Sequence, residues 1–314
     1  MKIKTQAEEQ ILTLSDMAVG LTGKQKSIPA KFLYDEKGSQ LFEEITDLPE
    51  YYQTRTESEI LLDNIEVWQK IFNQPTALIE LGSGSSKKTK ILLDHMKGIT
   101  SYVPIDISEE FLSDVVTSLQ SQYPEIAVEG ISADYTQPFS LPVLEEVQKV
   151  VFFPGSTIGN FEPEEAVGFL SNIRSLLQAG DRMIMGVDRK KDRATIEAAY
   201  NDQAGVTEAF NKNLLTRMNR EFGADFDIDA FDHVSFFNEI EGRIEMHLQS
   251  RTNQAVRVEG ETIVFRAEER IHTENSYKYD PGDMVRLAKA SGFQLRTVVS
   301  DERDYFSVCV LEVL

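Results

Sequence analysis

Five short apolar segments alternate with helical patterns in the middle of the chain, and this alternation limits the possible folds more than any other feature. The apolar segments lie at residues 77–81, 101–106, 128–132, 149–155 and 181–188. The helical patterns lie at residues 87–96, from Ser108 onward, and from Glu162 to Gly180. Short apolar runs separated by helices are typical of parallel strands that are buried on both faces. The sequence therefore predicts an α/β fold with a parallel sheet between layers of helices.

The C-terminal part of the chain has a different pattern. Residues 284–293 predict a helix that is capped by Gly292. Two runs rich in β-branched residues follow at 294–300 and 305–314, and the turn-forming sequence DERD separates them. We expect these runs to form a hairpin that adds an antiparallel edge to the parallel sheet.

Two regions do not follow the alternation. Residues 1–60 precede the first strand and have helical patterns, and residues 190–278 separate the fifth strand from the last helix. The second region contains a long helical stretch at 194–223, an acidic loop at 223–233, and alternating strand patterns at 243–250 and 261–268. We expect residues 1–60 and 190–278 to form one lobe that covers the ligand-binding edge of a core made by 61–189 and 279–314.

Charge and cysteine content exclude several classes of protein. The chain has 314 residues, with 32 basic and 52 acidic side chains and a net charge of −20. Such a surface repels phosphate backbones and anionic membranes, so we expect neither nucleic acid nor membrane as a partner. The single cysteine, Cys309, lies in an apolar run and is interpreted as a small core residue. The lack of cysteine pairs and the charged N-terminal sequence predict a cytoplasmic protein, and we expect a monomer.

A glycine turn follows the first apolar run. The sequence GSGSS at residues 82–86 lacks the third glycine of the dinucleotide fingerprint, because Lys87 stands at that position. The turn nevertheless connects a strand to a helix, and Asp106 ends the next strand 24 residues after Gly82 (106 − 82 = 24), where an acid suits ribose hydroxyls. Asp134 follows the third strand, where it could meet an adenine amino group. This layout is similar to S-adenosylmethionine-dependent methyltransferases with a Rossmann-like class I sheet; a tight turn without a ligand is the alternative.

Longer blocks resemble one family more closely. These blocks are residues 28–61, 78–93, 152–163, 198–231, 243–248 and 272–279, and they include the sequences LPEYYQTR and GSTIGN. They resemble the L-histidine Nα-methyltransferases of ergothioneine biosynthesis over almost the whole chain. Enzymes of that family transfer three methyl groups from S-adenosylmethionine to the α-amino group of histidine and produce hercynine.

The resemblance implies roles for the matching residues. The residues implied around S-adenosylmethionine are Tyr34, Gly82, Lys88, Asp106, Asp134 and Tyr135. The residues implied at the carboxylate and amine of histidine are Tyr51, Asn160 and Tyr200, with Phe42, Gly155 and Thr207 close by. Those implied at the imidazole are Met246, Glu274 and Ser276. We expect Tyr34 and Asn160 to be the catalytic residues, and we expect the two outer regions to form a substrate-binding lobe.

The residue types agree with this chemistry and leave alternatives open. Tyrosine hydroxyls and an asparagine can hold a carboxylate without adding a cation beside a sulfonium. By type alone, Tyr51 could instead pack in the helical lobe, and Asn160 could close an Asx turn. Glu274 and Ser276 share a face if their segment is extended, and otherwise they belong to a cap or turn. Met246 alternates with apolar neighbours and could be a core residue.

Methyl transfer from a sulfonium needs a neutral amine in line with the methyl group and requires no metal. The four histidines have no metal-ligand spacing and are interpreted as surface or satisfied core residues. Either Tyr34 accepts the amine proton or the proton is lost to solvent, and we expect Tyr34 and Asn160 to orient the lone pair. The rival functions are the same reaction on tyrosine or tryptophan, an S-adenosylmethionine sensor without turnover, and a nicotinamide dehydrogenase.

Overall fold

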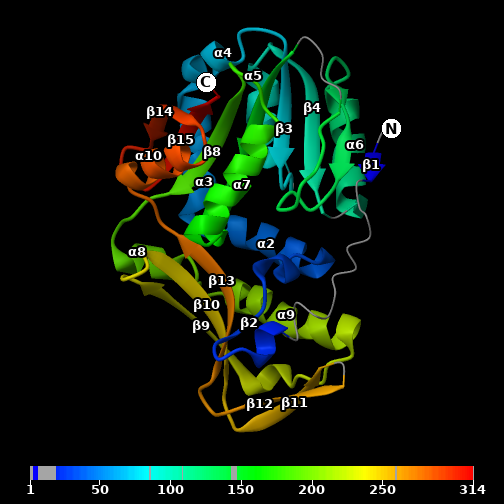
Figure 1. The fold of residues 1–314 in the computed structure, drawn as a ribbon, viewed down its shortest axis with the longest axis vertical. Coiled ribbons are helices and arrows are strands. Elements are labelled where there is room, and N and C mark those ends of the chain that lie inside the picture. The colour runs from blue at the N-terminus through cyan, green and yellow to red at the C-terminus, as the bar shows by residue number, and fades with distance from the viewer. Residues whose placement is uncertain are drawn as a thin grey trace. The chain divides into compact units, whose positions relative to one another are not determined.

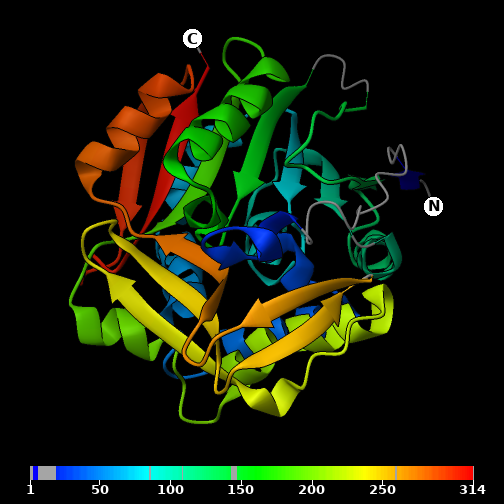
Figure 2. The same ribbon diagram turned by 60° about the horizontal axis from the view of Figure 1, so that its bottom comes forward.

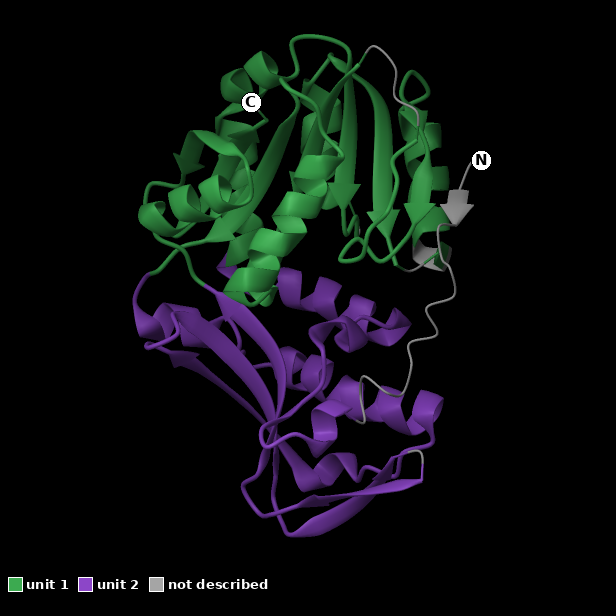
Figure 3. Ribbon diagram, viewed as in Figure 1, with its two compact units in different colours: residues 1–8, 53–190, 278–314 green, residues 9–52, 191–277 purple. Residues whose placement is uncertain are grey.

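The structure is a computed structural model that describes residues 3–5, 19–84, 86–107, 109–142, 147–258 and 260–313. The described chain divides into two compact units (Figure 3). Of the described residues, unit 1 contains 3–5, 53–190 and 278–313, and unit 2 contains 19–52 and 191–277. No helix among these residues is both long and apolar enough to cross a membrane.

Unit 1 contains a mixed sheet in the spatial order β1, β6, β4, β3, β7, β8, β15 and β14, with β5 paired to β4 (Figure 1). The strands are β1 (Ile3–Thr5), β3 (Thr76–Leu81), β4 (Ile99–Asp106), β5 (Ala127–Val128), β6 (Gly130–Ser132), β7 (Gln148–Phe153), β8 (Arg182–Asp188), β14 (Gln294–Ser300) and β15 (Phe306–Glu312). The strands from β1 to β8 are parallel, and β15 runs antiparallel to both β8 and β14. The predicted α/β class, the parallel central strands and the C-terminal antiparallel hairpin are therefore confirmed, except that the strand expected at 128–132 is divided at Glu129 into β5 and β6.

Helices cover both faces of this sheet. They are α3 (Tyr52–Asp63), α4 (Ile65–Ile71), α5 (Lys87–His95), α6 (Glu109–Gln122), α7 (Pro163–Ser175) and α10 (Pro281–Ala290). Trp68 of α4 and Leu92 of α5 lie in one core with Phe152 and Phe306 of the sheet. On the opposite face Phe169 of α7 packs against Phe153, with ring centroids 5.0 Å apart. Burial on both faces explains why the strands are apolar at nearly every position.

Cys309 is a core residue, as the sequence predicts. Its side chain is fully buried, and its sulfur lies 3.2 Å from the sulfur of Met284 in α10. Burial raises the pKa of the Cys309 thiol to about 12, so the thiol stays protonated at neutral pH.

Several predicted bounds in unit 1 are wrong. Helix α7 begins at Pro163 behind a capping box formed by Glu162 and Glu165, but it ends at Ser175 instead of near Gly180. Helix α10 begins at Pro281, before residue 284, because Asp280 and Asp283 form another capping box. The expected start of a helix at Ser108 lies outside the described residues, and the helix is described from Glu109.

Unit 2 contains a four-stranded sheet and a separate hairpin (Figure 2). The sheet has the order β2 (Lys26–Ser27), β13 (Arg270–Tyr277), β10 (Arg243–Ser250) and β9 (Phe231–Asn238), and the hairpin pairs β11 (Gln254–Val258) with β12 (Glu261–Phe265). The helical elements are η1 (Ala30–Leu33), α2 (Glu36–Thr46), α8 (Arg193–Ala198), α9 (Val206–Phe222) and η3 (Ile228–Ala230).

The single long helix expected at 194–223 is two helices, α8 and α9. Asp202 causes the break, because its carboxylate accepts hydrogen bonds from the backbone N–H groups of Val206 (2.9 Å) and Thr207 (2.8 Å). Gly205 precedes α9 with a φ of +75°, which a residue with a Cβ rarely adopts. The acidic loop expected at 223–233 is also shorter, since β9 already begins at Phe231.

Residues 53–60, which the sequence analysis assigns to the lobe, belong to unit 1. They form most of α3, and the buried side chains of Ile60 and Leu61 lie in the core with Trp68. The lobe boundary therefore lies at residue 52, where the apolar face of α3 begins to pack in the core of unit 1.

Candidate active site

The glycine turn after β3 is tightly held against its neighbours in unit 1. The N–H of Gly82 donates to the carbonyl of Ile105 at 2.8 Å, and the N–H of Gly84 lies 3.4 Å from Oδ2 of Asp106. Gly82 has a φ of +70°, and a Cβ there would lie 3.4 Å from the ring of Tyr135. The structure therefore brings together Gly82, Asp106 and Tyr135, which the sequence places 24 and 29 residues apart (106 − 82 and 135 − 106).

Asp134 and Tyr135 follow β6 at the same edge of the sheet. The N–H of Ala133 donates to the carbonyl of Asp106 at 3.0 Å, so the segment is fixed to the end of β4. Oδ1 of Asp134 accepts from the N–H and the hydroxyl of Thr136, at 3.0 and 2.5 Å. Burial, followed by the carboxylates of Asp106 and Asp134, raises the pKa of Tyr135, so its phenol remains protonated.

These residues fit S-adenosylmethionine, the methyl donor that the resemblance implies. Two carboxylates, Asp106 and Asp134, can accept hydrogen bonds from ribose hydroxyls and an adenine amino group. The missing Cβ at Gly82 lets the ring of Tyr135 pack directly against the turn. The hydroxyl of Ser83 is buried and has no hydrogen-bond partner among the described residues, so a polar group at the turn is available to a ligand.

Lys88, in the first turn of α5, is held by a residue that sequence reasoning missed. Its ammonium lies 2.5 Å from Oε2 of Glu57 in α3, and the same oxygen accepts from the N–H of Gly155 at 2.8 Å. The side chain of Glu57 is 0% exposed. The only sequence signal is a glutamate on the buried side of α3, between Thr56 and Ile60, and that signal does not identify its partners.

The loop GSTIGN follows β7 and carries Gly155 and Asn160. Gly155 and Ser156 have successive positive φ angles of +80° and +58°, and the hydroxyl of Ser156 accepts from the N–H of Asp188 at 2.8 Å. The short helix η2 (Thr157–Asn160) follows, and the hydroxyl of Tyr279 donates to the carbonyl of Ile158 at 3.3 Å. Asn160 is therefore the last residue of a fixed turn beyond the carboxyl end of β7, and its side chain is partly exposed.

Glu80 is a second residue that sequence reasoning missed. It ends the apolar run of β3, it is buried, and the phenol of Tyr102 donates to its carboxylate. Burial raises the pKa of Glu80 to about 7, although hydrogen bonds from Thr89 and Tyr102 lower it. A carboxyl group that changes charge near neutral pH therefore lies two residues before Gly82.

In unit 2, the predicted aromatic residues form a continuous series. Tyr34 packs on Phe42 with ring centroids 5.6 Å apart, Phe42 on Tyr51 at 6.2 Å, and Tyr51 on Tyr200 at 6.3 Å. The hydroxyl of Tyr200 then donates to Oγ of Ser276 at 2.8 Å. The structure thus connects Phe42 of α2 and Ser276 of β13 through tyrosines that lie between helices, namely Tyr34 before α2, Tyr51 before α3 and Tyr200 after α8.

The three predicted imidazole-binding residues share one face of the unit 2 sheet. Met246 of β10 pairs with Glu274 of β13, and Ile244 pairs with Ser276. Since β13 is a strand, Glu274 and Ser276 project to the same side, and the alternative of a cap or turn is wrong. Glu274, Ser276 and Met246 are all buried, at 8%, 4% and 1% exposure.

Thr207 lies in the first turn of α9. Its N–H donates to Oδ1 of Asp202 at 2.8 Å, and its side chain is 2% exposed. Burial tends to raise the pKa of Asp202, but hydrogen bonds from Thr207 and Val206 outweigh it and lower that pKa. A fixed carboxylate therefore positions the start of α9.

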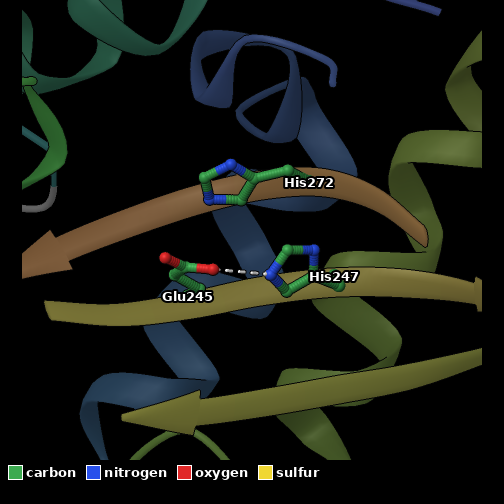
Figure 4. A group of neighbouring side chains, drawn as sticks. All are labelled: Glu245, His247 and His272. Atoms are coloured by element: carbon green, nitrogen blue, oxygen red, sulfur yellow. Dashed lines mark hydrogen bonds and ion pairs between the residues drawn. The ribbon is translucent and has the colours of Figure 1, made fainter. Parts of the chain in front are cut away.

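The opposite face of the same strands carries a cluster that sequence spacing did not reveal (Figure 4). Glu245, His247 and His272 each offer a ligand atom, and these atoms lie within 4.8 Å of one another. Nε2 of His247 lies 3.0 Å from Oε2 of Glu245, while Asn238 and Arg243 donate to Oε1. The rings of His247 and His272 are stacked, with centroids 4.7 Å apart and planes 21° apart. Because lone pairs lie in the ring planes, one ring would have to turn before both could bind a single metal ion.

We expect the stability of the protein to fall on acidification because of His247. Burial, then the neighbouring His272, lowers the pKa of His247 from 6.5 to about 4, although Glu245 raises it. Between pH 6.5 and 4 the imidazole of His247 binds a proton in the unfolded state but not in the folded state, so stability decreases as the pH falls through this window. The loss is on the order of 3 kcal/mol. Urea unfolding between pH 7 and pH 4 measures it.

The matched variants for this measurement are His247→Phe and His95→Phe. His95 is exposed, so its variant should keep the full pH dependence of the wild type. His247→Phe should have a shallower dependence between pH 6.5 and 4. Equal slopes in all three proteins would contradict the assignment.

Sequence comparisons identify the family. The sequence model of the family described as "Histidine-specific methyltransferase, SAM-dependent" matches residues 13–313. The histidine N-alpha-methyltransferase of Mycolicibacterium smegmatis is 42% identical over 281 residues, which cover 88% of this chain and 87% of the relative. That of Mycobacterium tuberculosis is 38% identical and covers 92% of both chains. Ergothioneine biosynthesis protein 1 of Neurospora crassa is 32% identical over 86% of this chain, but over only 31% of its own length. The chain therefore belongs to the S-adenosylmethionine-dependent, histidine-specific methyltransferases.

Proposed function

We propose that this enzyme transfers three methyl groups from S-adenosylmethionine to the α-amino group of L-histidine and produces hercynine, as a step of ergothioneine biosynthesis. The observation that carries the proposal is the buried face of β10 and β13. A carboxylate, a hydroxyl and a thioether lie side by side there, and the hydroxyl is already bound to Tyr200. This combination suits an imidazole, whose two ring nitrogens can each meet a polar group.

In unit 1, Gly82, Lys88, Asp106, Asp134 and Tyr135 would hold S-adenosylmethionine, which supplies a methyl group on a positive sulfonium. Asp106 and Asp134 would accept hydrogen bonds from the ribose and the adenine. The ammonium of Lys88 would meet a carboxylate of the ligand as a point charge. The protein then has to hold the acceptor amine in line with the methyl group.

The amino acid substrate would be held by neutral donors at one end and by the imidazole-binding face at the other. Tyr51, Tyr200 and Asn160 would bind the carboxylate and the amine, with Phe42, Gly155 and Thr207 close by. Glu274 and Ser276 would meet the ring nitrogens, and the thioether of Met246 would pack against the ring. Neutral donors fix the carboxylate without placing another cation near the sulfonium.

The buried carboxylate of Glu274 favours histidine over the rival substrates. A carboxylate that is 8% exposed is costly beside the apolar face of an indole or a phenol, but it is compensated by an imidazole N–H. A sensor without turnover would need no second set of amino-acid ligands. We also propose a cytoplasmic monomer that acts on free histidine, and the proposed reaction requires no metal, nucleic acid or membrane.

Tyr34 and Asn160 are proposed to orient the lone pair of the amine, without a strong base. Tyr34 is already fixed by its packing against Phe42 and Phe210. The variant Tyr34→Phe should slow the first and third methyl transfers by about tenfold, because misplacement of reacting groups is costly. Single-turnover rates for each transfer measure the effect. Unchanged rates for both transfers would remove Tyr34 from the mechanism.

The experiment that tests the substrate is a competition. The purified enzyme is incubated with S-adenosylmethionine and an equimolar mixture of the twenty amino acids, and the products are measured by mass spectrometry. We expect methylation of histidine alone. Methylation of tyrosine or tryptophan would show that Glu274 and Met246 are misassigned, and no product would favour a sensor.

A further inference from the structure

Glu57 is a buried carboxylate of unit 1 that the proposed mechanism does not use. Its Oε2 lies 2.5 Å from the ammonium of Lys88 and 2.8 Å from the N–H of Gly155. The side chain of Glu57 is 0% exposed, and that of Lys88 is 13% exposed. One oxygen atom therefore holds two groups that come from different parts of the sequence and that both carry proposed roles in the site.

The surrounding backbone keeps Glu57 in this position. A Cβ at Gly186 of β8 would lie only 2.1 Å from Oε1 of Glu57, so any other residue there would displace the carboxylate. Oε1 itself is buried and has no hydrogen-bond partner among the described residues. Burying a carboxylate oxygen without a hydrogen-bond partner costs stability. Because the fold keeps Glu57 despite this cost, we infer that the contacts of Oε2 are needed.

The two groups held by Glu57 belong to the proposed sites of different ligands, the methyl donor and the amine of the substrate. Lys88 lies in the first turn of α5, directly after the glycine turn that would hold S-adenosylmethionine. Gly155 begins the loop that ends at Asn160, the proposed ligand of the amine. A Cβ at Gly155 would lie 3.6 Å from Nζ of Lys88, so the loop and the ammonium are also packed directly together.

We propose that Glu57 is a positioning residue that fixes the Lys88 ammonium and the Gly155–Asn160 loop in one arrangement. It acts through Lys88 on the methyl donor and through Gly155 on the loop that carries Asn160, and it touches neither ligand. This inference rests on the proposed function for the role of Asn160, but its effect on binding of the methyl donor does not depend on which amino acid is methylated.

The test compares Glu57→Gln, Lys88→Met and the double variant. Glutamine still accepts a hydrogen bond from Gly155 but cannot pair with the ammonium, so it removes the charge and keeps the shape. Calorimetry with S-adenosylhomocysteine measures binding without turnover. We expect each single variant to raise Kd by at least about tenfold. The Kd of the double variant should lie within about twofold of the higher of the two single-variant values, because both substitutions break the same ion pair between Glu57 and Lys88.

Kinetics separate positioning from a merely structural role. Glu57→Gln and Lys88→Met should both act mainly on KM for S-adenosylmethionine, because both keep the hydrogen bond from the N–H of Gly155 to residue 57, whereas Glu57→Ala removes this acceptor and should also lower kcat. The matched control is Glu59→Gln, an exposed glutamate in the same helix, which should leave Kd, KM and kcat unchanged. If Glu57→Gln does not fold, Kd of the double variant is compared with that of Lys88→Met instead. The double variant leaves no unpaired buried charge.

Two results would overturn the inference. Kd, KM and kcat of Glu57→Gln could match those of the wild type while only the urea midpoint falls, which would make Glu57 structural. The losses of binding free energy in the two single variants could also add fully in the double variant, which would show that Glu57 and Lys88 act independently on binding. If the wild type methylates another amino acid, the proposed function fails, but the binding comparison still tests Glu57.

Discussion

Replacing Asp106 with alanine is expected to weaken the binding of S-adenosylhomocysteine by about 100-fold, because two hydrogen bonds from ribose hydroxyls to a carboxylate would be lost. Asp106 ends β4, and its Oδ2 lies 3.4 Å from the N–H of Gly84, so the substitution also removes one of the contacts of the glycine turn. Isothermal titration calorimetry measures the change. The matched control is Asp114→Ala, which removes an exposed carboxylate from α6 and should leave Kd unchanged.

An Asp106→Ala variant that binds S-adenosylhomocysteine as tightly as the wild type would contradict the location of the methyl donor. The donor would then not lie at the carboxyl ends of β3 and β4. A loss of equal size in the control would show that net charge, and not the position of Asp106, is responsible.

Replacing Glu274 with alanine is expected to raise KM for histidine by about 100-fold, because a hydrogen bond between a charged group and the ring is lost. Glu274 belongs to unit 2 and is not among the residues proposed to hold the methyl donor, so Kd for S-adenosylhomocysteine should stay within about twofold of the wild type. Steady-state kinetics with histidine and calorimetry with S-adenosylhomocysteine give the two values.

The control for this variant is Glu261→Ala, an exposed glutamate in β12 of the same unit. It should leave KM for histidine unchanged. If Glu274→Ala also leaves KM unchanged, the carboxylate does not bind the imidazole, and the preference for histidine must come from other residues.

Much of unit 1 could be predicted because its strands carry a local signal. Each of the five central strands is an apolar run with a turn at its end, and the antiparallel hairpin follows from two β-branched runs around DERD. Asp106 could be placed for the same reason, since it ends one of these runs. Several predicted helix bounds were wrong because side chains cap the helices. The carboxylate of Asp202, for example, binds the N–H groups at the start of α9 within the stretch expected to be one long helix.

The contacts of Glu57 could not be predicted, because its partners are distant in the sequence. Lys88 is 31 residues away and Gly155 is 98 residues away, and no local pattern connects them. A glutamate on the apolar side of α3 has the same sequence appearance whether it is paired or exposed at a helix edge.

The histidine cluster was missed for a similar reason. The register between β10 and β13 shifts after Met246, so that Glu274 pairs with Met246 and His272 pairs with His247, which leaves Thr273 as an extra residue. The hydroxyl of Thr273 donates to the carbonyl of Met246 at 3.0 Å and supports this bulge. A strict alternation would have placed His272 on the other face. The roles of Tyr34, Tyr51 and Met246 came from the family resemblance, since their residue types alone also fit a core.

The most direct test of the account is the product formed from histidine and S-adenosylmethionine with an isotopically labelled methyl group. Tandem mass spectrometry of the product reports both the number and the position of the methyl groups. The account predicts three labelled methyl groups on the α-nitrogen and an unmodified imidazole. A final product with fewer methyl groups, or with a methyl group on a ring nitrogen, would contradict it.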